Sequence, residues 1–206
     1  MPVYTYTTLD DPSAIGTFAE GINDTSQIVG YYGSNYGFFY SAGSYTTIND
    51  PLAAQAYGGI QAYGINATGQ IVGTYDDSSS RSHGFLYSGG SYTTLDDPLG
   101  IGSTSAFGIN ATGQIVGFYN DGNLNHGFLY SGGSYTTLDD PLATQGTYAF
   151  GINNKGQIVG IYNGSNGQQH GFLYSNGTYT TLDDPLGVDT QCLWYQRQGP
   201  DRWRIL

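Results

Sequence analysis

The stretch Gly108-Ile-Asn-Ala-Thr-Gly-Gln-Ile-Val-Gly117 decides the fold, because it recurs along the chain at a nearly constant interval. Its Gly-Ile-Asn tripeptide occurs at 21–23, 64–66, 108–110 and 151–153, so the spacings are 43, 44 and 43 residues. A Gln-Ile-Val-Gly tetrapeptide follows each copy. Self-similarity at a fixed period of this length indicates a repeat architecture.

The second half of the repeat is equally regular. Gly-Phe-Leu-Tyr occurs at 84–87, 127–130 and 171–174, and Gly37-Phe-Phe-Tyr40 is a variant first copy. Tyr-Thr-Thr follows each copy and leads into Leu-Asp-Asp-Pro or, once, into Ile48-Asn-Asp-Pro51. One unit therefore consists of short apolar segments separated by Gly, Asn, Asp, Ser and Pro, which are turn-forming residues.

The third unit shows what these segments predict. Its four β-prone segments are Ser105–Asn110, Gln114–Tyr119, His126–Tyr130 and Ser134–Leu138, and Pro141 follows the last one. Proline cannot donate to a strand ladder, so it belongs after a strand rather than within it. Four consecutive short strands in about 44 residues are typical of one β-propeller blade. A duplicated β-sandwich or barrel is the alternative; β-helices and helical repeats need other periods or compositions.

Composition assigns the chain to the all-β class. Glycine accounts for 33 of the 206 residues and tyrosine for 20, while only 10% of the residues are charged. Strand-forming Tyr, Thr, Ile and Val are abundant, and residues for long amphipathic helices are scarce. Low hydrophobicity also fits disorder. The apolar residues recur at fixed places, however, so we expect the repeat region to be folded.

Charge and hydropathy limit the partners. The formal net charge is −11, with 16 acidic and 5 basic residues. Nucleic-acid binding requires clustered Lys and Arg, so we expect no nucleic-acid partner. No apolar run approaches the roughly 20 residues of a membrane span, so we expect no membrane insertion, and no signal peptide is visible. The single Cys192 excludes an internal disulfide.

The repeats predict a particular arrangement of the chain. Residues 1–190 read as a single repeat domain, in which four complete units end at Pro185. The segment Tyr4–Asp11 matches the fourth strand of a unit but precedes the first unit. Propeller rings close when a terminal strand joins the blade formed by the other end of the chain. We therefore predict a β-propeller with four complete repeats and an N-terminal closure strand, derived from a five-bladed ring.

Residues 191–206 form an aberrant C-terminal tail that matches no unit. Both Trp residues, the only Cys and three of the five basic residues lie within 192–206. One possible set of codons for this segment, read one nucleotide later, encodes Ala-Tyr-Gly-Ile-Asn-Ala-Arg-Ala-Gln-Ile-Val-Gly. Our hypothesis is that the tail is a fifth blade read out of frame, and an unrelated terminal extension is the alternative.

The pattern Gly-Ile-Asn-x-x-Gly-Gln-Ile-Val-Gly followed by His-Gly-Phe-Leu-Tyr resembles the bacterial HAF repeats, a family described as probable extracellular repeat proteins. The resemblance covers residues 4–185 and carries His-Gly-Phe in place of His-Ala-Phe. It implies a bacterial, extracellular or cell-surface setting and carries no settled activity.

Two sets of repeated polar residues are candidate sites. One His begins the third segment of three units, at His83, His126 and His170, and Tyr36 replaces it in the first unit. Three such residues could converge on a metal ion, but a ring bonded to a neighbouring loop in each blade fits the Tyr replacement better. Aspartate pairs at 10–11, 96–97, 139–140 and 183–184 could bind Ca²⁺ or act as catalytic carboxylates, but Asp-Asp-Pro is also a common turn. We therefore predict no metal, no cofactor and no catalytic residues.

No nucleophile elbow, metalloprotease helix or phosphate-binding loop is present in the sequence, so we expect no enzyme. The units differ most in loops 53–60, 76–82 and 163–169, which are rich in Ser, Asn, Gly and Gln. Such loops beside exposed tyrosines suit weak binding of neutral sugars, repeated around a ring. We expect a lectin-like binding module with carbohydrate or protein ligands and with ligand-binding residues unassigned. The alternatives are a protein-interaction or cell-surface scaffold and a truncated, non-functional propeller fragment.

Overall fold

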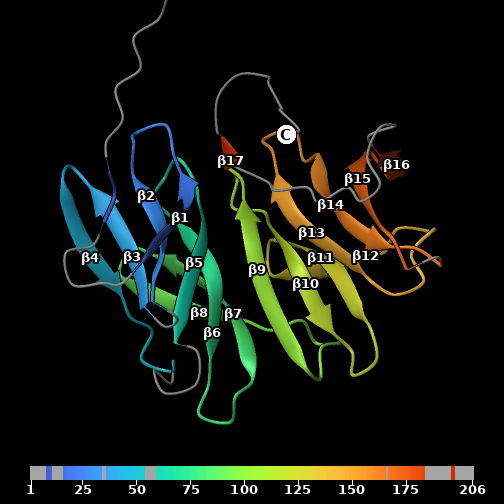
Figure 1. Ribbon diagram of the computed structural model, residues 1–206, viewed down its shortest axis with the longest axis horizontal. Coiled ribbons are helices and arrows are strands. Elements are labelled where there is room, and N and C mark those ends of the chain that lie inside the picture. Colours follow the sequence, from blue (N-terminus) through green and yellow to red (C-terminus); the bar gives the residue numbers. More distant parts are fainter. Residues whose placement is uncertain are drawn as a thin grey trace, which may run out of the picture.

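The computed structural model describes residues 8–10, 16–33, 36–53, 59–165 and 167–183, together with the backbone of 196–197. These residues form four sheets, each built around four consecutive antiparallel strands, and the first sheet has a short fifth strand paired in parallel. We number the sheets blades 1 to 4 in chain order. Figure 1 shows the blades fanned side by side, with blade 1 and blade 4 at opposite sides.

The strand bounds are nearly identical from blade to blade. Blade 1 contains β1 (Thr17–Ile22), β2 (Ile28–Tyr32), β3 (Tyr36–Ser41) and β4 (Ser44–Ile48). Blade 2 contains β5 (Ile60–Ile65), β6 (Ile71–Asp76), β7 (Ser82–Ser88) and β8 (Ser91–Leu95). Blade 3 contains β9 (Ser103–Ile109), β10 (Ile115–Asn120), β11 (Asn125–Ser131) and β12 (Ser134–Leu138). Blade 4 contains β13 (Thr147–Ile152), β14 (Ile158–Asn163), β15 (Gln169–Ser175) and β16 (Thr178–Leu182).

The predicted repeat unit is confirmed as a four-stranded sheet. In blade 3 the strand β12 has the predicted bounds, and the other three strands differ from the prediction by one or two residues at their ends. The turn between β11 and β12 contains Gly132 and Gly133, with φ values of 58° and 88°. Two consecutive residues with positive φ are what a tight two-residue hairpin turn requires, and glycine adopts them without strain.

The first strand of each blade lies nearest to the other blades. Strands β1, β5, β9 and β13 contact one another in that order. Their Gly-Ile-Asn glycines permit this approach, since a Cβ on Gly108 would lie 2.8 Å from the Phe150 carbonyl oxygen. The absence of a side chain at this position therefore permits the close backbone contact between blades 3 and 4.

The hydrophobic core lies between the blades, in three clusters of nearly the same composition. Each includes a buried Phe of the third strand, and the first adds Ile60. At each junction one blade contributes the Val of Ile-Val-Gly and the residue that ends its fourth strand. The next blade contributes an Ala and an Ile from its first strand and an Ile and a Tyr from its second. Between blades 2 and 3 these residues are Val72, Leu95, Ala106, Ile109, Ile115 and Tyr119, each at most 3% exposed. Each blade therefore depends on its neighbour for burial of its apolar face.

The Asn of Gly-Ile-Asn joins the blades through hydrogen bonds. The Oδ1 atom of Asn110 accepts bonds from the backbone N–H groups of Thr112 and Gln114, at 3.1 and 3.0 Å, and so closes the turn into β10. Its Nδ2 donates to the Asn153 carbonyl oxygen of blade 4, at 3.2 Å. Asn23 and Asn66 donate in the same way to the carbonyl oxygens of Asn66 and Asn110, at 3.0 and 3.1 Å. We call this series of bonds the Asn relay.

Two predicted segments lie almost wholly outside the described residues. Of the closure strand Tyr4–Asp11, only 8–10 are described, and they contain no strand. Of the tail 191–206, only β17 (Gln196–Arg197) is described, and it pairs in parallel with Gly21 and Ile22 of β1. Ring closure and the out-of-frame fifth blade therefore stay predictions. The described residues contain no helix long and apolar enough to cross a membrane.

Candidate functional site

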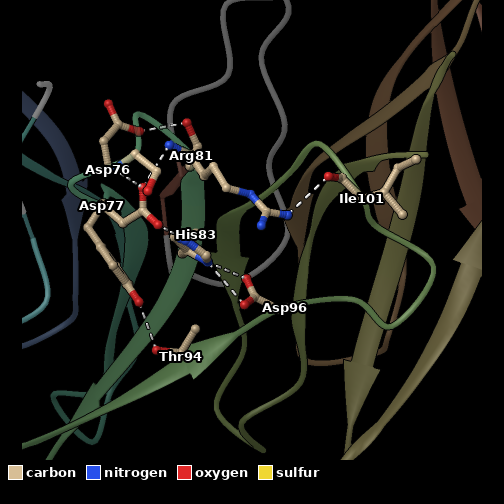
Figure 2. A network of polar contacts seen from close by, with 10 residues as sticks. Asp76, Asp77, Arg81, His83, Thr94, Asp96 and Ile101 are labelled. Atoms are coloured by element: carbon tan, nitrogen blue, oxygen red, sulfur yellow. Dashed lines mark hydrogen bonds and ion pairs between the residues drawn. The ribbon is translucent and has the colours of Figure 1, made fainter. Parts of the chain in front are cut away.

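Each of the three histidines is held within its own blade. Nδ1 of His83 lies 2.9 Å from Oδ1 of Asp96, which follows the last strand of the same blade. Nε2 lies 3.4 Å from Oδ2 of Asp77 in the loop before β7. The imidazole also stacks on Tyr75, with the ring centroids 5.1 Å apart. Figure 2 shows His83 between the two carboxylates.

Blade 3 repeats this arrangement, and blade 4 keeps the Nδ1 contact and the stacking on the second-strand tyrosine. His126 lies 2.9 Å from Asp139 through Nδ1 and 3.5 Å from Asp121 through Nε2. His170 lies 2.8 Å from Asp183. Burial opposes protonation of His126, but the bonds and negative charges of Asp139 and Asp121 outweigh it and raise the pKa of this histidine. Each histidine therefore ties the last strand of its blade to the third strand.

These histidines do not converge on one site, because each belongs to a different blade. In the described part of the chain, no three His, Cys, Asp or Glu residues are grouped as metal ligands. In blade 1, Tyr36 takes the place of the histidine and stacks on Tyr32, with the ring centroids 5.3 Å apart. Stacking on the second-strand tyrosine is thus the feature that the histidines and Tyr36 share.

The two aspartates of Asp-Asp-Pro have different roles. The second one closes a turn: Oδ1 of Asp97 accepts the backbone N–H of Leu99 at 2.9 Å, and Asp140 accepts that of Leu142 at the same distance. Burial raises the pKa of Asp97, and the Leu99 bond lowers it in part. The first aspartate bonds the histidine. Sequence reasoning considered these residues separately, although His and Asp are 13 residues apart in all three blades.

The loops that the sequence favoured for ligand binding are held by internal bonds where they are described. In 76–82, Oδ1 of Asp77 accepts the backbone N–H groups of Ser79 and Arg81, at 2.8 and 3.0 Å. These bonds lower the pKa of Asp77. The Arg81 guanidinium donates to the Ile101 carbonyl oxygen at 3.0 Å, which links blade 2 to the loop before β9 (Figure 2). Residues 54–58 and 166 of the other two loops lie outside the described residues.

A row of side chains that the sequence analysis missed lies along the inner strands. In every blade the residue before Gly-Ile-Asn is a β-bulge, an extra residue with no partner on the second strand. A bulge re-aims the side chain that it carries, and bulges are common beside binding sites. The four bulge residues are Glu20, Tyr63, Phe107 and Phe150. We call them the inner row, and all four are half-buried.

The aromatic members of the inner row contact one another across blade boundaries. Tyr63 and Phe107 stack with their ring centroids 4.6 Å apart, and Phe107 meets Phe150 edge to face at 5.4 Å. Second-strand aromatics extend the group, since Phe118 stacks on Phe107 at 5.6 Å and Tyr31 meets Tyr63 at 6.3 Å. The result is a continuous aromatic surface drawn from four blades.

Glu20 is the single acidic member of the inner row. Burial raises its pKa above the ordinary value. Burial also raises the pKa of Tyr63, with further contributions from the negative charges of Tyr31 and Glu20. The surface therefore offers aromatic faces, a neutral phenol group and one carboxyl group. The signal available in the sequence was the variation at this one position, Glu, Tyr, Phe and Phe, before an invariant Gly-Ile-Asn.

Solved structures show which fold these blades form. The chain is similar to a TolB-type protein from Agrobacterium tumefaciens, with a TM-score of 0.60 and 12% identity, over 82% of this chain and 61% of that chain. It is also similar to the β-propeller domain of the Trilobed protease from Pyrococcus furiosus, with a TM-score of 0.50 and 11% identity, over 72% and 43%. At such identities the likeness shows the fold alone. The protein has a β-propeller fold of repeated blades.

The chain spans less than two thirds of the length of either solved structure. A looser overlap exists with the Aleuria aurantia lectin, with a TM-score of 0.46 and 13% identity, over 81% of this chain and 55% of the lectin. That overlap carries no argument about binding. No family model and no curated protein sequence matches the chain. The HAF resemblance therefore stays a prediction.

Proposed function

We propose that the protein is a non-enzymatic binding module whose inner row recognises uncharged carbohydrate. The observation that carries this proposal is the repeated bulge, which places one side chain per blade on a shared, half-exposed aromatic surface. Aromatic rings present an apolar face to the C–H groups of a sugar, and phenol and carboxyl groups hydrogen-bond its hydroxyls.

Charge favours a neutral ligand. The chain carries a formal net charge of −11, and Glu20 adds a carboxyl group to the surface itself. Sulfated, phosphorylated or carboxylated sugars would meet electrostatic repulsion as they approach. An uncharged sugar meets none, and its hydroxyls can donate to Glu20 or bond the phenol group of Tyr63.

The inner row is a better candidate than the inter-blade loops. The described loop at 76–82 uses its carboxylate oxygens for its own turn and for His83, so few of its polar atoms remain for a ligand. The aromatic rings of the inner row pack against one another, but all of them are only half-buried and so keep part of their surface exposed. A bacterial surface setting, as the HAF resemblance implies, would bring such a module into contact with glycans.

A glycan array followed by titration calorimetry tests the proposal. We expect binding to one or more neutral oligosaccharides and a loss of about two- to tenfold in affinity for Phe107→Ala, since stacking contributes roughly 0.5–1.5 kcal/mol. Phe107→Tyr is the matched control, because Tyr63 occupies the same position in blade 2, and it should keep the affinity. Silence on all neutral glycans, or full affinity in Phe107→Ala, would contradict the proposal.

A protein-interaction scaffold is the second candidate function. One specific observation favours it: Ile22 of blade 1 is 41% exposed, whereas its equivalents Ile65, Ile109 and Ile152 in the other blades are at most 3% exposed.

A further inference from the structure

The junction between two blades has two different halves. One half, which we call the covering face, carries the Val of Ile-Val-Gly, the last residue of the fourth strand and the Nδ2 atom of the Asn relay. The other half, the receiving face, carries an Ala and an Ile of the first strand with an Ile and a Tyr of the second. Between blades 3 and 4, Val116 and Leu138 cover Ala149, Ile152, Ile158 and Tyr162. Because the halves differ, a chain of blades has one unused half at each end.

Blade 1 carries the unused receiving face. Ile22 is 41% exposed, whereas its equivalents Ile65 and Ile109 are fully buried. Ala19 is exposed, and Ile28 and Tyr32 are half-buried, although their equivalents in the other three blades are buried. The strand β17 does not change this, because it pairs along the edge of β1 and a paired strand lies in the plane of the sheet.

Blade 4 carries a covering face that is open only in part. Leu182 is half-buried, whereas its equivalent Leu138 is 2% exposed. Among the described residues, Nδ2 of Asn153 donates only to Gln157, at 2.8 Å, and has no relay acceptor. A Cβ on Gly108 would meet the backbone of the next blade, but on Gly151 it would meet, among described atoms, only Val159. Val159 itself is buried, so the open part of this face lies around Asn153 and Leu182.

We propose that two copies of this chain associate head to tail, with the receiving face of blade 1 on the covering face of blade 4. Nδ2 of Asn153 then donates to the Asn23 carbonyl oxygen of the second copy, which continues the Asn relay. Ile22, Ile28 and Tyr32 become buried, as their equivalents are at the three internal junctions. A second copy is the partner that fits, because the internal junctions show that this chain itself contains a surface complementary to each end face.

The contact is heterologous, since two different surfaces meet. Such a contact gives a closed ring where its rotation closes and a longer linear assembly where it does not. Both copies carry a net charge of −11, so association should strengthen as salt screens their repulsion. Phe107 lies in blade 3, away from both end faces, so loss of sugar binding in Phe107→Ala and loss of association in Ile22→Asp can be distinguished.

Light scattering coupled to size exclusion measures the expected assembly. We expect the wild-type chain to exceed its monomer mass of 22.0 kDa, and the excess to grow with protein and salt concentration. Ile22→Asp should elute as a monomer at all concentrations. Leu124→Asp is the matched control, because Leu124 is 40% exposed but lies between β10 and β11, away from both end faces. It should assemble as the wild type does.

A mixing experiment separates a head-to-tail contact from every other mode. Ile22→Asp keeps its covering face, and Leu182→Asp keeps its receiving face, so each variant alone should be monomeric. An equimolar mixture should give a dimer and nothing larger. Circular dichroism checks that both variants are folded. A wild-type chain that stays monomeric at tens of micromolar and high salt overturns the proposal and leaves the ends for additional blades in the same polypeptide. A mixture that stays monomeric, or Ile22→Asp that assembles, also overturns it.

Discussion

Blade 1 and blade 3 have the same four strands and nearly the same sequence, but their receiving faces differ in exposure. Ile22 is 41% exposed and Ile109 is fully buried. The difference arises outside the blade: Val72 and Leu95 of blade 2 cover Ile109, whereas no described residue of another blade covers Ile22 in this way. The comparison separates what one repeat specifies, which is the four-stranded sheet, from what only two repeats together specify, which is the core.

The largest expected effect concerns a constraint inside the blade. A Cβ on Gly117 would overlap the Ser105 carbonyl oxygen and lie 2.8 Å from the Phe128 ring; Gly30 of blade 1 has the equivalent contacts. Gly117→Ala and Gly30→Ala should therefore both lower the free energy of unfolding, by about 3 kcal/mol or more, since overpacking forces backbone shifts. Urea denaturation measures this. If the blade 1 variant were much milder, the constraint would not be local to the sheet.

The second effect should differ between the blades. Ile109→Ala removes a buried side chain and should lower the free energy of unfolding by about 2–3 kcal/mol, because the removed atoms leave a cavity against the neighbouring blade. Ile22→Ala should cost less than about 1 kcal/mol when measured at protein concentrations too low for association. Equal losses in urea denaturation would show that blade 1 is covered and would remove the contrast between the two blades.

A third, smaller difference isolates the Asn relay. Asn110→Ala loses the turn bonds and the bond to the Asn153 carbonyl oxygen, so about 2 kcal/mol of stability should be lost. Asn153→Ala loses its turn bonds, and among described residues it has no relay bond to lose, so about 1 kcal/mol is expected. The difference between the two losses in urea denaturation gives the contribution of the relay bond together with the Thr112 hydroxyl bond to Asn110, which has no counterpart at Asn153. The relay has no measurable contribution if the two losses are the same.

The smallest effect is a pH dependence in blade 3. The pKa of His126 is raised in the folded protein. Its contribution to the free energy of unfolding is therefore complete below the ordinary histidine pKa of about 6.5, and it is lost as the pH rises through the folded-state pKa. The backbone N–H groups of Leu124 and Asn123 lower the pKa of Asp121, so its contribution is lost as the pH falls through the folded-state carboxyl value.

The contribution of His126 and Asp121 to the free energy of unfolding should therefore be greatest between about pH 4 and 6.5. His126→Tyr is the control, because Tyr36 keeps the stacking in blade 1 without a group that titrates in this range. Urea midpoints of the wild type should fall from pH 6 to pH 8 more steeply than those of the variant. Parallel pH profiles would contradict the assignment.

The four-stranded unit could be predicted because its determinants are local. Apolar alternation, the Gly132-Gly133 turn and Pro141 all act within a few residues, and the strands of blade 3 lie where the sequence predicts them. The pairing of His83 with Asp96 could have been predicted too, from the constant 13-residue interval and the hairpin register of β7 and β8.

The inner row could not be predicted in the same way. A bulge depends on how the first and second strands pair, and Phe107 is an extra residue only because Ala106 and Gly108 face successive residues of β10. The sequence pattern places Phe107 within an ordinary strand. The exposure of Ile22 could not be predicted from the sequence either. Ile22 and Ile109 both stand between Gly and Asn, and they differ in what packs against them.

The bulge also bears on how such a protein could diversify. A chain that grows by duplication starts with identical repeats, and most positions in each repeat are fixed by the ladder, the turns or the adjacent blade. The bulge residue has no ladder partner, so the pairing of the strands does not restrict its identity. Glu20, Tyr63, Phe107 and Phe150 already differ where the next three residues do not. One codon per repeat is therefore enough to give descendants of the same gene different ligand preferences.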